Sequence, residues 1–199
     1  MSLGSQQPHS FLGPLKGKTT TFLVDNTQVN LSFAKSIALL IGITTSGCAI
    51  LDLDAFYSSN SDEILSALPP SALRSTHVYV PEPGSSVETE LPRLFRAESG
   101  VFIVDSLNTF YHLFSSSGVG SRSRKLAFAV TSLSYLARTS GKAVLFTMYR
   151  RERAMRTGGD RSISDFSDAT VSVKATGSGL LIECARGTAW PEGKFSLMT

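Results

Sequence analysis

Two short segments of the chain follow apolar runs, at the kind of place where nucleotide-binding α/β proteins hold phosphate and Mg²⁺. The first is DNTQVNLS at residues 25–32, a polar loop between the apolar run TTTFLV and an amphipathic segment. Nucleotide-binding α/β proteins grip phosphate at such a place with glycine amides and a lysine, and this loop has neither residue. The second is VFIVDS at residues 101–106, where Asp105 follows four apolar residues. An acid at the carboxyl end of a parallel strand lies where a phosphate-bound Mg²⁺ is within reach.

Basic residues are concentrated in one quarter of the chain. Residues 116–161 carry ten Lys/Arg against two Asp/Glu, a net charge of +8, whereas residues 1–115 carry −4 and residues 162–199 carry −1. So local an excess favours a surface for an anionic partner. Two alternatives stay open. The block is a solvated helix face, or its arginines pair with acids of a neighbouring subunit.

Alternating strands and helices are expected to position these segments. The helix candidates span 31–45, 62–68, 87–95 and 125–138, and they alternate with short β-branched or apolar runs. This order is typical of a parallel sheet covered by helices on both faces. Two later runs with a Gly-containing turn predict an antiparallel hairpin, and the stretches 115–123 and 150–161 are expected to be loops. The expected strands are 19–24, 48–53, 76–80, 101–105, 142–147, 168–174, 180–186 and 194–198.

The bulk properties indicate one α/β domain over residues 19–199, preceded by an N-terminal arm over 1–18 whose first residues read as an expression scar. No apolar run reaches the roughly 18 residues that span a bilayer, and no signal peptide is visible, so we expect a cytoplasmic protein without membrane partners. Cys48 and Cys184 have apolar neighbours and are expected to be buried free thiols, with a disulfide as the alternative. The spacing of histidines and cysteines predicts no metal site.

Four segments, taken in order, resemble the RecA/RadA-type recombinases. VFIVDSLNTFY resembles a Walker B strand, and GVGSRSRKLAFAVTSLSYLA resembles the Gly-then-basic loop and following helix. KAVLFTMYRRERAMRTGGDRSISDFSDATVSV resembles the next strand with its DNA-facing loop, and LLIECARGTAWPEGKFSL resembles the closing strands. The resemblance implies a RecA-like three-layer core, a mostly parallel central sheet with a C-terminal antiparallel hairpin. An unrelated parallel α/β domain is the alternative.

The resemblance also implies a degenerate nucleotide site. Aligned with the family's P-loop, Asp25 and Asn30 replace the two glycines and Leu31 replaces the lysine. Asp54 stands where the family has a glutamate that orients the attacking water, and it is one methylene shorter. We therefore expect neither ATP and Mg²⁺ binding nor catalysis; strand-end acids that make turn or cap hydrogen bonds are the favoured interpretation. The vestigial positions are Ser32, Asp54 and Asp105.

The family's two DNA-binding loops correspond to residues 116–125 and 149–161, and the resemblance implies single-stranded DNA binding there. Arginine forks suit phosphate oxygens, and Tyr149 has a ring that can stack on a base. No base-reading pattern is evident, so binding should be sequence-tolerant and salt-dependent. The residues expected to bind nucleic acid are Arg122, Arg124, Lys125, Tyr149, Arg150, Arg151, Arg153, Arg156 and Arg161.

The sequence thus predicts a non-catalytic RecA/RadA paralogue, a pseudo-ATPase that binds single-stranded DNA and assists a recombinase in DNA repair. From the residues given, we expect neither the family's N-terminal helical domain nor a clear F-x-x-A-type segment. Expected partners are single-stranded DNA and a recombinase or sibling paralogue, and homo-oligomerisation stays open. The alternatives are a subunit of a RecA-like ring or KaiC-like regulatory assembly that acts through protein or RNA contacts, and an ATPase with a divergent P-loop.

Overall fold

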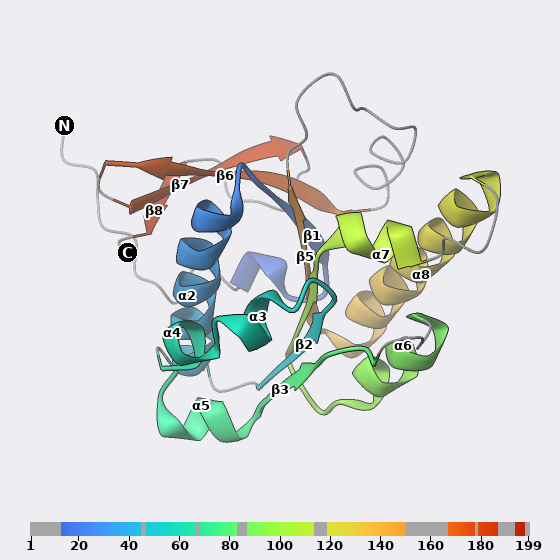
Figure 1. Ribbon diagram of the computed structural model, residues 1–199, viewed down its shortest axis with the longest axis horizontal. Coiled ribbons are helices and arrows are strands. Elements are labelled where there is room, and N and C mark those ends of the chain that lie inside the picture. Colours follow the sequence, from blue (N-terminus) through green and yellow to red (C-terminus); the bar gives the residue numbers. More distant parts are fainter. Residues whose placement is uncertain are drawn as a thin grey trace.

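A computed structural model describes residues 13–44, 47–66, 68–82, 87–113, 119–149, 167–177, 179–186 and 194–197. These residues form an eight-stranded sheet flanked by helices (Figure 1). The strands are β1 (Thr19–Val24), β2 (Cys48–Asp52), β3 (Thr76–Tyr79), β4 (Val101–Asp105), β5 (Ala143–Tyr149), β6 (Ala169–Thr176), β7 (Gly179–Arg186) and β8 (Lys194–Leu197).

The sheet order is β3-β2-β4-β5-β1-β6-β7-β8. The first six strands are parallel, with β1 between β5 and β6. The β6–β7 and β7–β8 pairs are antiparallel. The predicted fold class, a mostly parallel α/β sheet with a C-terminal antiparallel hairpin, is therefore confirmed.

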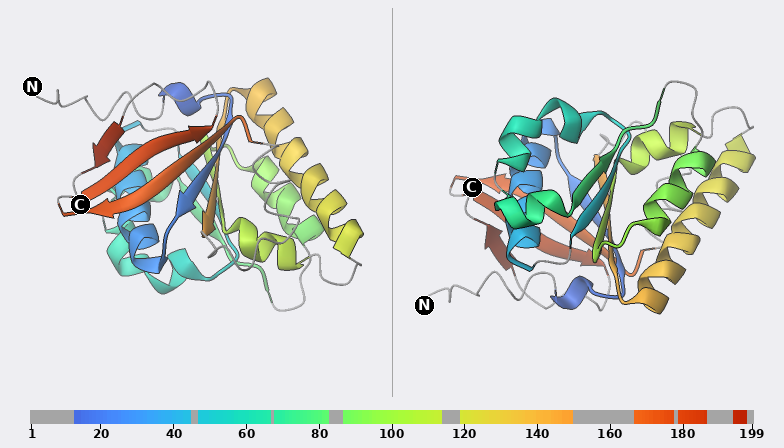
Figure 2. Two further views of the ribbon diagram at one scale, coloured as in Figure 1. Left: turned by 90° about the horizontal axis from the view of Figure 1, so that it is seen from above. Right: turned by 90° about the horizontal axis from the view of Figure 1, so that it is seen from below.

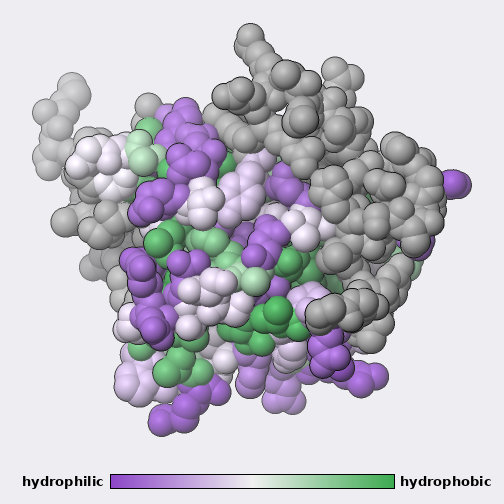
Figure 3. Space-filling view, viewed as in Figure 1, coloured by the Kyte–Doolittle hydropathy of each residue, from purple (hydrophilic) through white to green (hydrophobic). Residues whose placement is uncertain are grey.

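Helices cover both faces of the sheet. They are η1 (Gly13–Leu15), α2 (Thr27–Thr44), α3 (Phe56–Ser59), α4 (Ser61–Leu65), α5 (Pro70–Arg74), α6 (Val87–Arg96), α7 (Leu107–Leu113) and α8 (Val119–Ser140). Residues of α2 to α5 share one core cluster, and residues of α6 to α8 share another. Figure 2 shows the two helical layers on opposite sides of the twisted sheet. Over the face that α2 to α5 present, hydrophilic and hydrophobic residues are interspersed (Figure 3).

The strand sequences explain this three-layer arrangement. Side chains alternate between the two faces of a strand, so a strand buried on both faces is apolar at nearly every position. In β4, Val101 and Ile103 belong to the cluster under α2, whereas Phe102 and Val104 belong to the cluster under α8. The continuous run VFIVD is the sequence signature of that double burial.

Four helices and two helix starts differ from the sequence prediction. Helices η1, α3, α5 and α7 were not predicted, because each is too short to show a helical period. Helix α2 begins at Thr27, four residues before the predicted start. Helix α8 begins at Val119, so the prediction of a loop is wrong for residues 119–123. Extending a formed helix costs only about 1 kcal/mol for a glycine such as Gly120, and packing of the later turns outweighs that cost.

Cys48 is a buried free thiol, as predicted, and burial raises the pKa of that thiol. The other predicted loop, residues 150–161, lies outside the described residues. Among the helices that the structure describes, none combines the length and apolarity that a bilayer crossing needs.

Candidate functional site at the carboxyl edge of the sheet

The carboxyl ends of β1, β2, β4 and β5 lie along one edge of the sheet, because these strands are parallel. Helix α2 follows β1 directly and begins at the same edge. Helix α8 links β4 to its parallel neighbour β5, so it also begins near this edge and runs back toward the amino ends (Figure 1). Ligands of open α/β sheets bind at this edge, and the predicted residues Asp54, Asp105 and Tyr149 lie along it.

The Asn26 side chain caps the N-terminus of α2, at the end of the short loop that follows β1. The Asn26 Oδ1 atom accepts a 3.0 Å hydrogen bond from the backbone N–H of Val29. This is an N-cap, and it satisfies one of the amides that a helix N-terminus would offer to an anion. Asp25 is exposed at the tip, and the side chain of Leu31 packs against the core. The loop therefore presents a carboxylate and uses one helix-end amide internally.

Asn30, in the first turn of α2, connects this helix to β4 and β5 through its side-chain amide. Its side chain is fully buried, and Nδ2 donates 2.9 Å to Tyr149 Oη and 3.5 Å to Asp105 Oδ2. Its Oδ1 atom has no hydrogen-bond partner among the described residues. A buried orphan carbonyl costs free energy. The Asn30 side chain is therefore held inside a buried polar network that leaves its carbonyl oxygen unsatisfied.

Asp105 is the buried acid at the centre of this network. Its Oδ1 atom accepts the hydroxyl of Thr147 on the neighbouring strand. Burial raises the pKa of the Asp105 carboxyl to about 7, helped by the charges of Asp54 and Asp52, while hydrogen bonds from Thr147 and Asn30 act in the opposite direction. The carboxyl therefore titrates near neutral pH, which makes it a weaker Mg²⁺ ligand than an exposed aspartate.

Tyr149 ends β5 and is half-buried. Its backbone N–H donates 2.9 Å to Asn108 Oδ1, and its hydroxyl accepts from Asn30. Burial, together with the charge of Asp105, raises the pKa of the phenol to about 12. These contacts fix the last residue before the arginine-rich stretch. Whether the ring also stacks on a base stays a prediction.

The acids at the end of β2 have different partners. Asp52 is fully buried and accepts hydrogen bonds from the backbone N–H of Phe56 at 2.7 Å and of Ser58 at 2.8 Å. It therefore holds the start of α3. Asp54 is exposed and accepts the hydroxyl of Thr109, which ties the β2 turn to α7. The turn and cap role was expected for Asp54 and Asp105, whereas the acid that makes such backbone contacts is Asp52; the hydrogen bonds described for Asp54 and Asp105 are to side chains of other elements.

The remaining predicted residues are placed only in part. Ser32 lies on α2, one turn beyond the cap, and is partly exposed. Arg122, Arg124 and Lys125 lie on the first two turns of α8, not on a loop; Arg124 is exposed and Lys125 partly so. The structure therefore brings α8's first turns and Tyr149 to the same sheet edge. The other expected contacts, Arg150, Arg151, Arg153, Arg156 and Arg161, lie outside the described residues.

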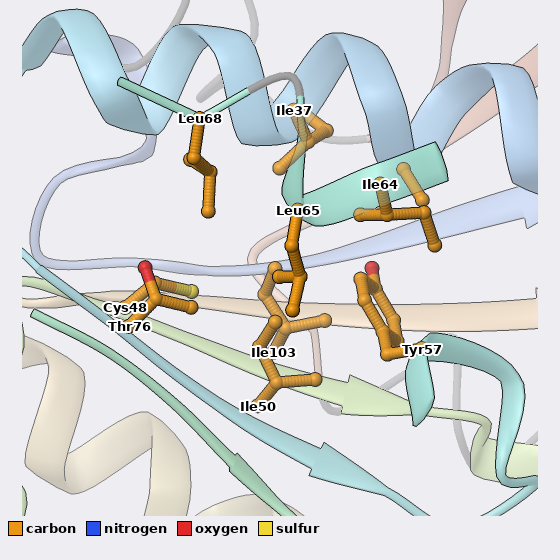
Figure 4. Close-up of a pocket in the computed structure, with 10 residues that line it drawn as sticks. Ile37, Cys48, Ile50, Tyr57, Ile64, Leu65, Leu68, Thr76 and Ile103 are labelled. Atoms are coloured by element: carbon orange, nitrogen blue, oxygen red, sulfur yellow. The ribbon is translucent and has the colours of Figure 1, made fainter. Parts of the chain in front are cut away.

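A small cavity lies between α2, α4 and the sheet, away from the polar network. Figure 4 shows Ile37, Leu65 and Ile103 pointing into it, with Cys48 and Tyr57 at its sides. It has room for little more than one water molecule, and its lining is almost wholly apolar. Such a cavity is a packing defect of the core, too small for a nucleotide.

Among the described residues, no three His, Cys, Asp or Glu side chains are placed to hold a metal ion together. Sequence reasoning missed Asn108, Thr147 and Asp52. A signal existed for Asp52, which is the last residue of an apolar strand, as Asp105 is. Thr147 and Asn108 carry no such signal, because their roles depend on which strands are neighbours.

No protein-family model matches the chain, and no curated protein matches it significantly.

Proposed function

We propose that the chain is a non-catalytic relative of the RecA/RadA recombinases that binds single-stranded DNA at the carboxyl edge of its sheet and assists a recombinase in DNA repair. The observation that carries the proposal is that the start of α8, with Arg124 and Lys125, and Tyr149, the last described residue before the arginine-rich sequence, both lie toward the carboxyl edge. Helix α8 begins at the edge where β5 ends. Eight of the ten basic residues in the +8 block of residues 116–161 either precede Leu126 in α8 or come after Tyr149 in the sequence.

Chemistry at the same edge supports binding without hydrolysis. The α2 N-terminus is capped by Asn26, and the acid that would meet Mg²⁺ is buried against Thr147 and Asn30. Basic side chains near an edge of this kind attract a polyanion through counterion release, with little dependence on sequence. The strand order and the antiparallel hairpin support the family relationship, which itself rests on the sequence resemblance.

The test is a titration of a fluorescent single-stranded oligonucleotide with the full chain at low and moderate salt. Affinity should fall steeply with salt, because each phosphate contact adds about −0.7 to the log–log slope for single strands. Arg151→Ala plus Arg156→Ala should weaken binding by about tenfold or more and reduce that slope by about 1 to 2.

A matched control removes two charges from the opposite edge. Arg74 ends α5 before β3, and Arg96 ends α6 before β4, so both exposed side chains lie at the amino edge. Arg74→Ala plus Arg96→Ala should leave affinity and slope near those of the wild type. Equal losses in both double variants would mean that net charge, not this edge, drives binding, and the site assignment would be wrong.

A further inference from the structure

Strand β5 extends past the end of its neighbour β4. The last pair that the structure describes between them is Val104 with Phe146, and β4 ends at Asp105. On the other side, β1 stays beside β5 to the end, with Val24 paired to Tyr149. The last residues of β5 therefore have a strand on one side only. A backbone N–H on the open side needs a partner from another element, because an unpaired N–H away from water is costly.

Asn108, in the first turn of α7, supplies this partner. Its Oδ1 atom accepts a 2.9 Å hydrogen bond from the backbone N–H of Tyr149. Two positions earlier on β5, the Thr147 hydroxyl donates to Asp105. Because α7 follows β4 directly, its first turn lies beside the end of β5 (Figure 1). Side chains therefore continue the contacts of β5 on the side where β4 has ended, and Asn108 provides the contact to the last described residue of the strand.

Tyr149 is held at its backbone and at its hydroxyl by two different helices. Asn108 of α7 accepts from its N–H, and the Asn30 side chain of α2 donates 2.9 Å to its hydroxyl. Its ring packs against the core cluster under α2, but the residue stays partly exposed. Strand ends otherwise fray, so these contacts restrict the ring before any ligand arrives. A ring restricted in advance loses less conformational freedom when it binds, which favours binding.

We propose that Asn108 is a positioning residue for the DNA-binding edge: by fixing the backbone of Tyr149, it holds the ring where a base of single-stranded DNA stacks on it. This role deepens the proposed function and rests on it. Asn108 acts through the main chain, so it needs no contact with DNA, and the hydroxyl bond to Asn30 at the far end of the ring is not part of its role.

A double-mutant cycle tests whether Asn108 acts through the ring. Asn108→Ala removes the acceptor and leaves the charge of the edge unchanged. It should weaken binding of a fluorescent single-stranded oligonucleotide by about threefold to tenfold, because one more side chain must then be ordered on binding. In a Tyr149→Ala background there is no ring to position, so Asn108→Ala should change affinity by less than about twofold. A purely structural contribution would give the same loss in both backgrounds.

Hydrogen exchange of the Tyr149 amide, followed by NMR in the absence of DNA, reports the Asn108 contact directly. The amide should exchange slowly in the wild type, because its N–H is hydrogen-bonded. In Asn108→Ala it should exchange at least about tenfold faster, whereas amides in the middle of β5 should keep the protection they have in the wild type. This pattern would show that the substitution releases the end of the strand and leaves the rest of the sheet intact.

A matched control removes a hydrogen bond from the next residue of the same helix. The Thr109 hydroxyl donates to Asp54 at the end of β2, so it ties α7 to a different strand. Thr109→Val removes this bond, keeps the size of the side chain and leaves the Asn108 contact in place. The variant should bind the oligonucleotide as the wild type does, and its Tyr149 amide should stay protected.

Equal oligonucleotide affinity of Asn108→Ala and the wild type overturns the role of Asn108 and leaves the proposed function standing. The same holds if Asn108→Ala causes equal losses with and without the Tyr149 ring, or if Thr109→Val weakens binding as much as Asn108→Ala does. A Tyr149 amide that exchanges as slowly in Asn108→Ala as in the wild type overturns it as well. A wild type that binds no oligonucleotide even at low salt overturns the proposed function itself.

Discussion

Asn30 and Tyr149 are 119 residues apart in the chain, and the Asn30 side-chain amide donates a 2.9 Å hydrogen bond to the Tyr149 hydroxyl. The contact is possible because β1 and β5 are parallel neighbours, with Val24 paired to Tyr149. It joins the first turn of α2 to the residue that precedes the arginine-rich stretch. The start of α2 and the end of β5 are therefore one structural unit at the sheet edge.

Two substitutions of Tyr149 separate the hydrogen bond of its hydroxyl from the predicted stacking of its ring on a base. Tyr149→Phe removes the hydroxyl that Asn30 meets and keeps the ring, so the free energy of unfolding should fall by about 1 kcal/mol while oligonucleotide affinity stays unchanged. Tyr149→Ala also removes the ring, and affinity should then fall by about tenfold if the ring stacks on a base. Urea unfolding and anisotropy titration measure the two effects. A Tyr149→Phe variant as stable as the wild type would show that the hydrogen bond contributes nothing.

The raised pKa of Asp105 predicts how stability depends on pH. The folded carboxyl has a pKa of about 7 against an ordinary value of 3.8, so between these values the folded state binds more protons than the unfolded state. The free energy of unfolding should therefore fall as pH rises from about 4 to about 7. Asp105→Asn has no group that titrates at this position, so its free energy of unfolding should not show this decrease with pH. At pH 8 the free energy of unfolding of the variant should exceed that of the wild type by about 1–3 kcal/mol.

Urea unfolding at pH 5 and pH 8 tests this prediction. The new amide would meet the orphan Asn30 Oδ1 if the Asn30 amide rotates, and that contact would preserve the network. Asp54→Asn is the matched control, because Asp54 is exposed and its substitution also removes one acid from the same edge. If the free energy of unfolding changes equally between pH 5 and pH 8 in Asp105→Asn and in the wild type, the Asp105 carboxyl of the folded wild type is ionised at both pH values.

The lowered pKa of Asp168 predicts the opposite effect on stability: at acid pH, the free energy of unfolding should fall as pH decreases. Burial raises its pKa, but hydrogen bonds from the Thr19 N–H at 2.8 Å and from Arg138 at 2.6 Å outweigh that effect and lower it. Its contribution is therefore present above the ordinary pKa of an aspartate and lost as pH falls through the folded pKa. Because Asp168 is partly exposed and solvent screens its charge, Asp168→Asn should cost only about 1–2 kcal/mol at pH 7, and less at pH 3.

Arg138→Gln serves as the comparison for Asp168→Asn. It removes the exposed ion pair but leaves both Thr19 hydrogen bonds, so it should cost about 0–1 kcal/mol. Chemical unfolding at pH 7 and pH 3 ranks the two variants. If Arg138→Gln costs as much as Asp168→Asn, the ion pair and not the Thr19 contact holds β6 to β1.

The strands were predictable from the sequence to within a few residues because the buried central strands β2, β4 and β5 are nearly continuous apolar runs and β1, β3 and β6 are rich in β-branched residues. The bounds of β1 and β4 match the predicted 19–24 and 101–105. Helix starts were less predictable. Asn26 is a standard capping residue, but the apolar period of α2 becomes clear only from Leu31 onward, and Gly120 and the serines of 115–123 favour a loop by propensity alone.

Individual residues of the candidate site could be predicted from the sequence, but the contacts between them could not. Asp105 was found because an acid that ends an apolar strand is visible in the sequence. Its partners Asn30 and Thr147 lie 75 and 42 positions away, and they meet it only because the sheet order places β4 beside β5 and β5 beside β1. No local pattern encodes that order, so the polar network emerges only from the assembled sheet.

The same network predicts how the chain responds to nucleotide. Isothermal titration with Mg-ATP should show no saturable heat up to about 1 mM, a limit of roughly 4 kcal/mol of binding free energy. Asp25→Gly plus Leu31→Lys restores the charge pattern of a P-loop but leaves the buried Asn30 side chain in place. That variant should still fail to bind, because the lysine alone does not bring backbone amides to the phosphates.

Adding Asn30→Gly to this pair is the decisive comparison. Glycine removes the side chain that fills the edge and lets the backbone approach an anion, so the triple variant should bind Mg-ATP where the double variant does not. It should also be less stable by about 1–3 kcal/mol, since Tyr149 and Asp105 lose their shared donor. Binding by the wild type, or equal binding by the double and triple variants, would show that Asn30 does not close this edge to phosphate.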